Sequence, residues 1–297
     1  MAPSAGAAPD SVRIPGFNAD GTWLASMTPE QGPVLWQLGQ GHFVADRDLG
    51  ADALGVHTLI IGDDQQVLGI GADGVWRLPA GPDAEPLYPC GTRPGSTFAQ
   101  SPDRRLLAVA VTDNRGHDGV CVLDLDLPGQ VLLNRNLAEG ELRGLAFGPA
   151  GERLLTASAA GRTHLFDVPT GRRVLSLPAD GPRGRPFNAA VFDAGGERIA
   201  IAAADERVRL YLADGTPVQE LATSVIGGTR VKIHRTAVRD VAFAPDGDFL
   251  VAVDDEGQVV RWSTTEPGGG DGEGGGQARA VVLGSHELSV GDVAIAA

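Results

Sequence analysis

The chain contains only two cysteines, one lysine and no long apolar run. Cys90 and Cys121 are too few for a disulfide framework, and neither belongs to a Cys-x-x-Cys pair of the kind found in zinc and redox sites. We predict that Cys121 is a buried core residue. No apolar stretch reaches the roughly 18 residues of a membrane-spanning helix. Residues 1–10 lack the basic start and apolar segment of a secretory signal, so we expect a disordered N-terminal tail there and a soluble, cytoplasmic protein.

Acidic residues outnumber basic ones and give a formal net charge of -14 at pH 7. This charge repels phosphate backbones and anionic lipid, so we expect neither nucleic acid nor membrane as a partner. Lys232 is the only lysine among the 24 basic residues, and basic surface positions are therefore almost all arginines. The 42 glycines and 20 prolines indicate a chain with many turns.

An internal repeat is the main feature of the sequence. In residues 238–247 an apolar-spaced strand leads into the turn Pro245-Asp246-Gly247, and strands are expected again at 249–253 and 258–262. The same order recurs at 11–21, 142–151 and 192–196, and more weakly at 56–68 and 95–107. The equivalent turn positions lie 39 to 51 residues apart, and they are Gly21, Gln65, Arg104, Gly151, Gly196 and Gly247.

Each third strand ends in a large apolar residue, and an aspartate follows it only at Asp124 and Asp167. These apolar residues are Trp36, Trp76, Leu123, Phe166, Tyr211 and Trp262. A histidine precedes two first strands at identical spacing, as His234 before Val238 and His286 before Val290. We interpret both histidines as structural residues, hydrogen-bonded within their own repeat.

From about Ser11 to Ala297 this pattern resembles the WD40-repeat family, whose period is about 40–45 residues. The resemblance implies an all-β propeller in which four-stranded antiparallel blades surround a central channel. We therefore expect one propeller domain over residues 11–297, with six complete blades and the first strand of a seventh. Asp-Gly pairs that begin at positions 20, 73, 118, 180, 214 and 246 predict turns with positive φ.

The last repeat is short, because residues 290–297 align only with the first strand of the template. A truncated seven-bladed propeller is the favoured interpretation, and a six-bladed ring with a spare strand is the alternative. The exposed edge of an incomplete blade predicts self-association. The glycine-rich stretch 267–276 predicts a flexible loop between the last two strands of the sixth blade. It lacks the Lys-Ser/Thr of a phosphate-binding loop.

No catalytic spacing stands out. The six histidines form no His-Glu-x-x-His motif, and no Gly-x-Ser-x-Gly is present. Asp240 and Asp292 occupy equivalent positions, but the other repeats supply too few oxygen ligands there for a calcium site. We predict no catalytic residue, metal or cofactor. A propeller enzyme with channel-mouth carboxylates and a metal, or a truncated product without independent activity, are the alternatives.

A candidate binding surface comes from the position that enters each first strand. In a propeller these residues would form a ring on one face near the channel, and they are Arg13, His57, Ser96, Arg143, Asn188 and Arg239. Arginines there could hold an acidic or phosphorylated peptide through charge-assisted hydrogen bonds. The alternative is that they are merely solvated polar residues. The expected function is a non-catalytic scaffold or regulatory module that binds a protein or peptide.

Overall fold

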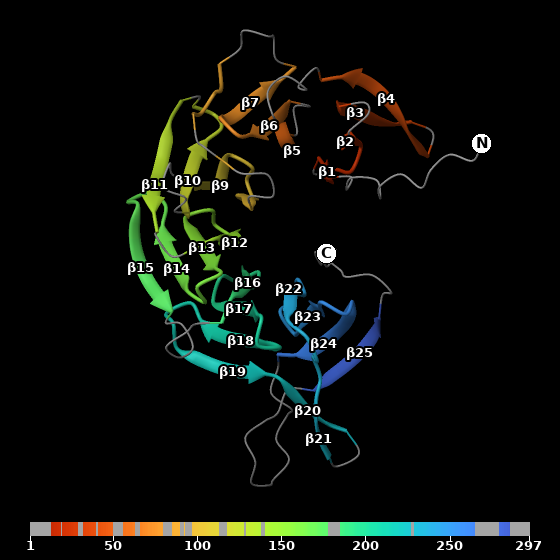
Figure 1. Ribbon diagram of the computed structural model, residues 1–297, viewed down its shortest axis with the longest axis vertical. Coiled ribbons are helices and arrows are strands. Elements are labelled where there is room, and N and C mark those ends of the chain that lie inside the picture. The colour runs from red at the N-terminus through yellow and green to blue at the C-terminus, as the bar shows by residue number, and fades with distance from the viewer. Residues whose placement is uncertain are drawn as a thin grey trace, which may run out of the picture. The chain divides into compact units, whose positions relative to one another are not determined.

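The computed structural model (Figure 1) consists of β-strands and turns, with no helix among the described residues. The structure describes residues 13–18, 20–28, 32–39, 41–49, 56–62, 66–79, 85–89, 92, 97–112, 118–127, 129–137, 140–177, 185–226, 229–264 and 279–285. The chain divides into two compact units. Unit 1 extends to residue 96 and includes 111–113 and 126–131, and unit 2 contains the rest.

Unit 1 holds two antiparallel sheets whose strands follow one another in chain order. The first sheet contains β1 (Arg13–Phe17), β2 (Trp23–Thr28), β3 (Gly32–Gly39) and β4 (His42–Asp48). The second contains β5 (Val56–Ile61), β6 (Val67–Gly71) and β7 (Gly74–Leu78). Residues 80–84, 90, 91 and 93–96, which follow β7, lie outside the described residues, so the fourth strand of this blade stays a prediction. An isolated antiparallel bridge joins Val75 of β7 to Tyr88.

Unit 2 contains four antiparallel sheets of four strands each among its described residues. They are formed by β8 (Phe98–Gln100), β9 (Leu106–Thr112), β10 (Asp118–Asp124) and β11 (Val131–Asn136); by β12 (Leu142–Phe147), β13 (Arg153–Ser158), β14 (Thr163–Asp167) and β15 (Arg172–Leu177); by β16 (Phe187–Phe192), β17 (Arg198–Ala203), β18 (Arg207–Leu212) and β19 (Pro217–Leu221); and by β22 (Val238–Phe243), β23 (Phe249–Asp254), β24 (Gln258–Ser263) and β25 (Ala280–Ser285). The first strands β12, β16 and β22 are spatial neighbours (Figure 1).

A separate hairpin, β20 (Thr223–Ile226) and β21 (Thr229–Lys232), lies in sequence between the last two of these sheets. It accounts for the longest spacing of the repeat, because it adds residues between Gly196 and Gly247 without adding a strand to either neighbouring sheet. The long step is therefore an insertion, as a repeat with variable loops allows.

The turns after the first strands have the backbone that the glycine pattern predicts. Gly21, Gly151, Gly196 and Gly247 have φ between 68° and 74°, and Arg104 takes the same left-handed conformation with φ of 60°. Gln65 lies outside the described residues. The turn predicted at Asp118-Gly119 was wrong, because both residues belong to β10. A Cβ on Gly119 would lie 2.3 Å from the Arg135 carbonyl oxygen, so close strand approach explains this glycine.

The hydrophobic core lies between neighbouring sheets. Fully buried Trp262 packs in one cluster with Leu250 and Val260 of its own sheet and with Val208 and Leu210 of the preceding one. Such stacking stabilises sheets that cannot bury their faces alone. The prediction for Cys121 is confirmed, since it is buried in β10.

Several predicted segments lie outside the described residues, namely 1–10, the glycine-rich stretch 267–276, His286 and the final strand 290–297. The glycine-rich stretch is flanked in sequence by β24 and β25. Among the residues that are described, no helix is long and apolar enough to cross a membrane.

Candidate interaction surface

A β-bulge recurs at the start of the first strand in three neighbouring sheets of unit 2. The strand register shifts between Leu142 and Gly144, between Phe187 and Ala189, and between Val238 and Asp240. The residue skipped by each shift is Arg143, Asn188 or Arg239, three of the candidates from the repeat alignment. A bulge removes a residue from regular pairing and re-aims its side chain, and bulges are common beside functional sites. We call these three residues the polar row.

Side-chain hydrogen bonds join two members of the polar row to each other and to the strand that carries the third. The Nη1 of Arg143 donates to the Oδ1 of Asn188 at 3.0 Å, and the Nδ2 of Asn188 donates to the carbonyl oxygen of Val238 at 2.7 Å. Asn188 is itself buried, so its amide connects the arginine of one sheet to the backbone of the next. These bonds position Arg143 and Asn188 and connect them to the strand that carries Arg239.

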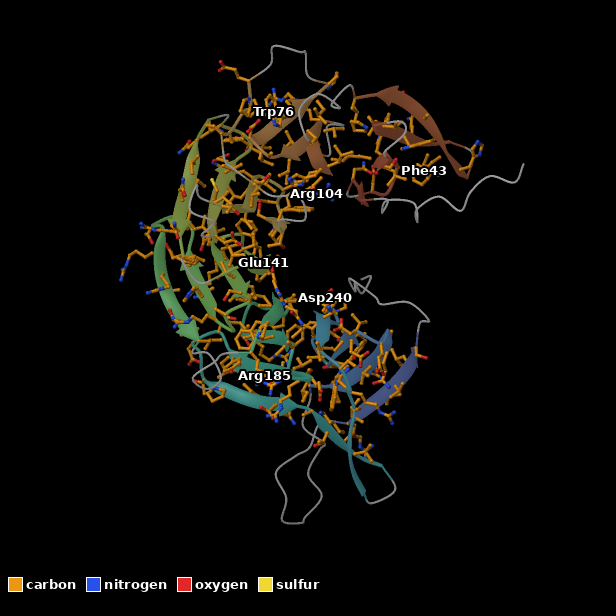
Figure 2. All side chains as sticks on the ribbon, in the orientation of Figure 1. Phe43, Trp76, Arg104, Glu141, Arg185 and Asp240 are labelled. Carbon is orange, nitrogen blue, oxygen red and sulfur yellow. The ribbon has the colours of Figure 1, made fainter. Side chains whose placement is uncertain are left out.

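Each arginine of the polar row also forms an ion pair at the surface. Arg143 pairs with Glu141 through Nε at 3.3 Å, and Arg239 pairs with Asp255. The two arginine side chains are 33% and 47% exposed. Figure 2 shows Glu141 and Asp240 along the inner side of the unit 2 sheets. Exposed pairs of this kind contribute at most about 1 kcal/mol, so a ligand can replace them at little cost.

Of the other three candidates from the repeat alignment, only His57 has a side chain that the structure describes. His57 occupies the same bulge position in β5, between Val56 and Thr58. However, it is only 4% exposed, and its Nε2 lies 3.0 Å from the Thr92 hydroxyl. Its ring is thus used inside unit 1 and offers a partner almost no surface. The side chain of Arg13, at the start of β1, and residue Ser96 lie outside what the structure describes.

The large apolar residues of the repeat lie in or against the core. Phe166 and Trp76 are buried, and Tyr211 packs against the cluster formed by β13, β14, β15, β16 and β17. The indole nitrogen of Trp36 donates to the Ser26 hydroxyl at 2.7 Å. These residues therefore contribute to packing within and between sheets.

His234 forms a buried network in the last sheet of unit 2. Its Nδ1 lies 3.2 Å from the Oδ2 of Asp254, and the Trp262 indole nitrogen donates to its Nε2 at 3.4 Å. The other oxygen of Asp254 accepts from the backbone of Glu256 and Gln258. Burial lowers the pKa of His234, and this effect exceeds the opposing influence of the hydrogen bond and charge of Asp254. The imidazole is therefore held in its neutral form.

We expect His234 to make stability depend on pH. Its pKa in the folded protein is below the usual 6.5, so as the pH falls through 6.5 the unfolded chain takes up a proton that the folded chain does not. The free energy of unfolding should then decrease, with a slope of at most about 1.4 kcal/mol per pH unit from this group. Denaturant unfolding between neutral pH and about pH 5.5 should show a shallower decrease for His234→Gln than for the parent protein.

His42 on β4 offers a matched control, because it is exposed. The substitution His42→Gln should leave the pH dependence of unfolding as it is in the parent. Identical slopes for the parent protein and His234→Gln would contradict the assignment of a buried, neutral imidazole.

Comparison with known families supports the architecture. Residues 228–263, which begin just before β21 of the inserted hairpin and continue through β22 and β23 to the end of β24, match the model of the WD domain, G-beta repeat. This match and the succession of four-stranded antiparallel sheets fit a WD40 β-propeller. WD40 repeats are generally non-enzymatic scaffolds that commonly bind proteins or peptides. A search of curated proteins gave no match.

The carboxylates that pair with the arginines of the polar row were not predicted from the sequence. Glu141 precedes Arg143 by two residues, and Asp255 lies in the turn after β23. The sequence offered a signal for Glu141 only, because it lies two residues before Arg143 and side chains two residues apart in a strand point to the same face. It offered none for Asp255, which lies 16 residues after Arg239. Within the described part of the chain, no group of three or more His, Cys, Asp or Glu side chains is placed to hold a metal ion.

Proposed function

We propose that this chain is a non-catalytic interaction scaffold that binds a segment of a partner protein at the polar row. The recurrence of one β-bulge in three neighbouring sheets carries the proposal. Each bulge places a polar residue at the same end of a first strand, and the resulting row crosses sheet boundaries. A peptide lying along the row would contact all three sheets at once.

The chemistry of the row favours a partner with carboxylate or phosphate groups. A guanidinium has five N–H donors, and within the described part of the chain Arg143 uses its Nε for Glu141 and its Nη1 for Asn188. The remaining donors suit bidentate binding of a planar carboxylate or a phosphate. A phosphate carries a charge of about -1.5 to -2 near neutral pH and should therefore displace Glu141 or Asp255 more readily than a carboxylate.

Binding of labelled peptides to the full chain tests this proposal. Acidic, threonine-phosphorylated and neutral peptide pools would be compared by fluorescence anisotropy. The double variant Arg143→Ala with Arg239→Ala should bind phosphorylated peptides roughly 10- to 100-fold more weakly, because two charge-assisted contacts are lost.

A matched control is available on β15, where Arg172 and Arg173 are exposed. Replacing both with alanine removes the same charge and should leave peptide binding unchanged. Equal weakening by the two double variants would show a general charge effect and reject the polar row as the binding site. Phosphorylated peptides that bind no better than neutral ones would reject the proposed ligand class.

A further inference from the structure

A second surface lies at the opposite ends of the same three first strands. The last residues of β12, β16 and β22 are Phe147, Phe192 and Phe243, and all three are partly buried. They line a groove of about 280 Å³, whose other walls are formed by Pro149, Asp193, Ala194, Ala244 and Pro245. The groove is thus built from one repeated aromatic position and the turn that follows it.

The side of the groove nearest β17 is fixed by a network around Arg198. The Oδ2 of Asp193 accepts from the Arg198 Nε at 2.8 Å, while its Oδ1 accepts from the backbone of Glu197 and Arg198. The Nη2 of Arg198 donates to the Gly247 carbonyl at 2.9 Å, and its guanidinium carbon lies 5.4 Å from the centre of the Phe243 ring. This preorganisation lowers the ordering cost of binding.

The walls are suited to an apolar side chain. Three phenylalanines and two prolines are among the eight lining residues, and the Asp193 carboxylate among them is already engaged by Arg198. The volume of the groove corresponds to that of about nine water molecules, because one molecule occupies roughly 30 Å³ in liquid water. Insertion of a large apolar side chain would release water from three aromatic surfaces.

The turns that form the rim of the groove carry several exposed acidic residues. Exposed carboxylates follow the lining residues in each of the three turns, at Glu152, Glu197, Asp246 and Asp248. The nearby basic groups have acidic neighbours of their own, since Arg198 pairs with Asp193 and Arg153 lies opposite Asp167 in the register of β13 and β14. The rim and the net charge of -14 both favour a basic ligand.

We propose that this groove is a second docking site, which binds a basic segment of a partner protein by enclosing one bulky apolar side chain between Phe147, Phe192 and Phe243. Arginine or lysine residues flanking that side chain pair with the carboxylates of the rim. The site is separate from the polar row, because it lies at the other end of the strands and selects the opposite charge.

The first test uses the unmodified full chain and three short fluorescein-labelled peptides. The probe has a central phenylalanine flanked on both sides by arginines in a Gly-Ser background. One control peptide replaces the phenylalanine with serine, and the other replaces the arginines with glutamates. We expect the probe to bind at least about tenfold more tightly than either control. The serine peptide loses the burial of an aromatic side chain, and the glutamate peptide loses the ion pairs with the rim.

The second test locates the binding. A photoreactive benzoyl group on the central phenylalanine should crosslink to residues 147–149, 192–194 and 243–245, as read by mass spectrometry. Ala194 is exposed and lines the groove, so the substitution Ala194→Trp should fill the groove. The affinity for the probe should then fall about tenfold or more. Ala160→Trp, in the turn at the other end of β13, should leave the affinity unchanged.

Three results would overturn the proposal. They are absence of binding, equal affinity for the phenylalanine and serine peptides, and crosslinks confined to other segments. The crosslink uses the unmodified chain, so it decides the question even if Ala194→Trp fails to fold. Binding of the probe should persist in the Arg143→Ala, Arg239→Ala variant, which separates this proposal from that for the polar row.

Discussion

Replacing Trp262 with alanine is expected to lower the free energy of unfolding by about 3–5 kcal/mol. The indole is fully buried among Leu210, Val241, Leu250 and Val260, so its removal leaves a cavity where two sheets meet. It also removes the hydrogen bond to the Nε2 of His234, which is itself fully buried. Unfolding in denaturant, with the midpoint and slope compared between variant and parent, measures the loss.

Two further substitutions separate the contributions of Trp262. Trp262→Phe retains much of the packing but removes the indole N–H, and it should cost clearly less than Trp262→Ala. Val218→Ala, on the half-exposed outer strand β19, should change stability by no more than about 0.5 kcal/mol. A loss below about 1 kcal/mol for Trp262→Ala would contradict the packing of these sheets against one another.

Gly196→Ala is expected to cost about 2–4 kcal/mol, for two reasons that add. With φ of 68°, Gly196 lies in the left-handed region, where a Cβ costs about 1–2 kcal/mol. The new Cβ would also lie 2.9 Å from the Cδ of Pro149 in the turn of the preceding sheet, and a rigid proline ring yields little. Thermal or denaturant unfolding of the purified variant measures the loss.

Gly151 provides the matched control, because its turn has the same backbone conformation but more space. Its φ is 74°, and a Cβ added there would have the Cβ of Ser101 as its nearest neighbour, 3.6 Å away. Gly151→Ala should therefore cost only the backbone component, about 1–2 kcal/mol. Equal losses for Gly151→Ala and Gly196→Ala would show that the turns of neighbouring sheets do not interlock.

The repeat in the sequence was sufficient to predict the strands and most of their turns. Alternating apolar residues followed by a turn glycine recur because each sheet must bury both faces against neighbours and then reverse direction. Arg104 shows that the alignment also located a turn without its glycine, since this arginine adopts φ of 60° at the aligned position. Trp262 and Phe166 were identified as structural for the same reason, and both are buried.

The polar contacts could not be predicted from the repeat, because they depend on residues distant in sequence. His57 aligns with Arg143 and Arg239, but its buried ring lies within hydrogen-bonding distance of the Thr92 hydroxyl, 35 residues later in unit 1. Alignment thus locates a position in a strand, whereas tertiary neighbours decide the role of its side chain.

Hydrogen exchange of the full chain with and without a phosphorylated peptide tests the central claim most directly. The backbone amides of the skipped residues Arg143, Asn188 and Arg239 are outside the regular ladder and should exchange readily in the free protein. If the polar row binds the peptide, exchange should slow at residues 142–144, 187–189 and 238–240 while the outer strands β15 and β19 stay unchanged. Protection confined to the outer strands, with none at the three bulges, would contradict the assignment of the polar row as the interaction surface.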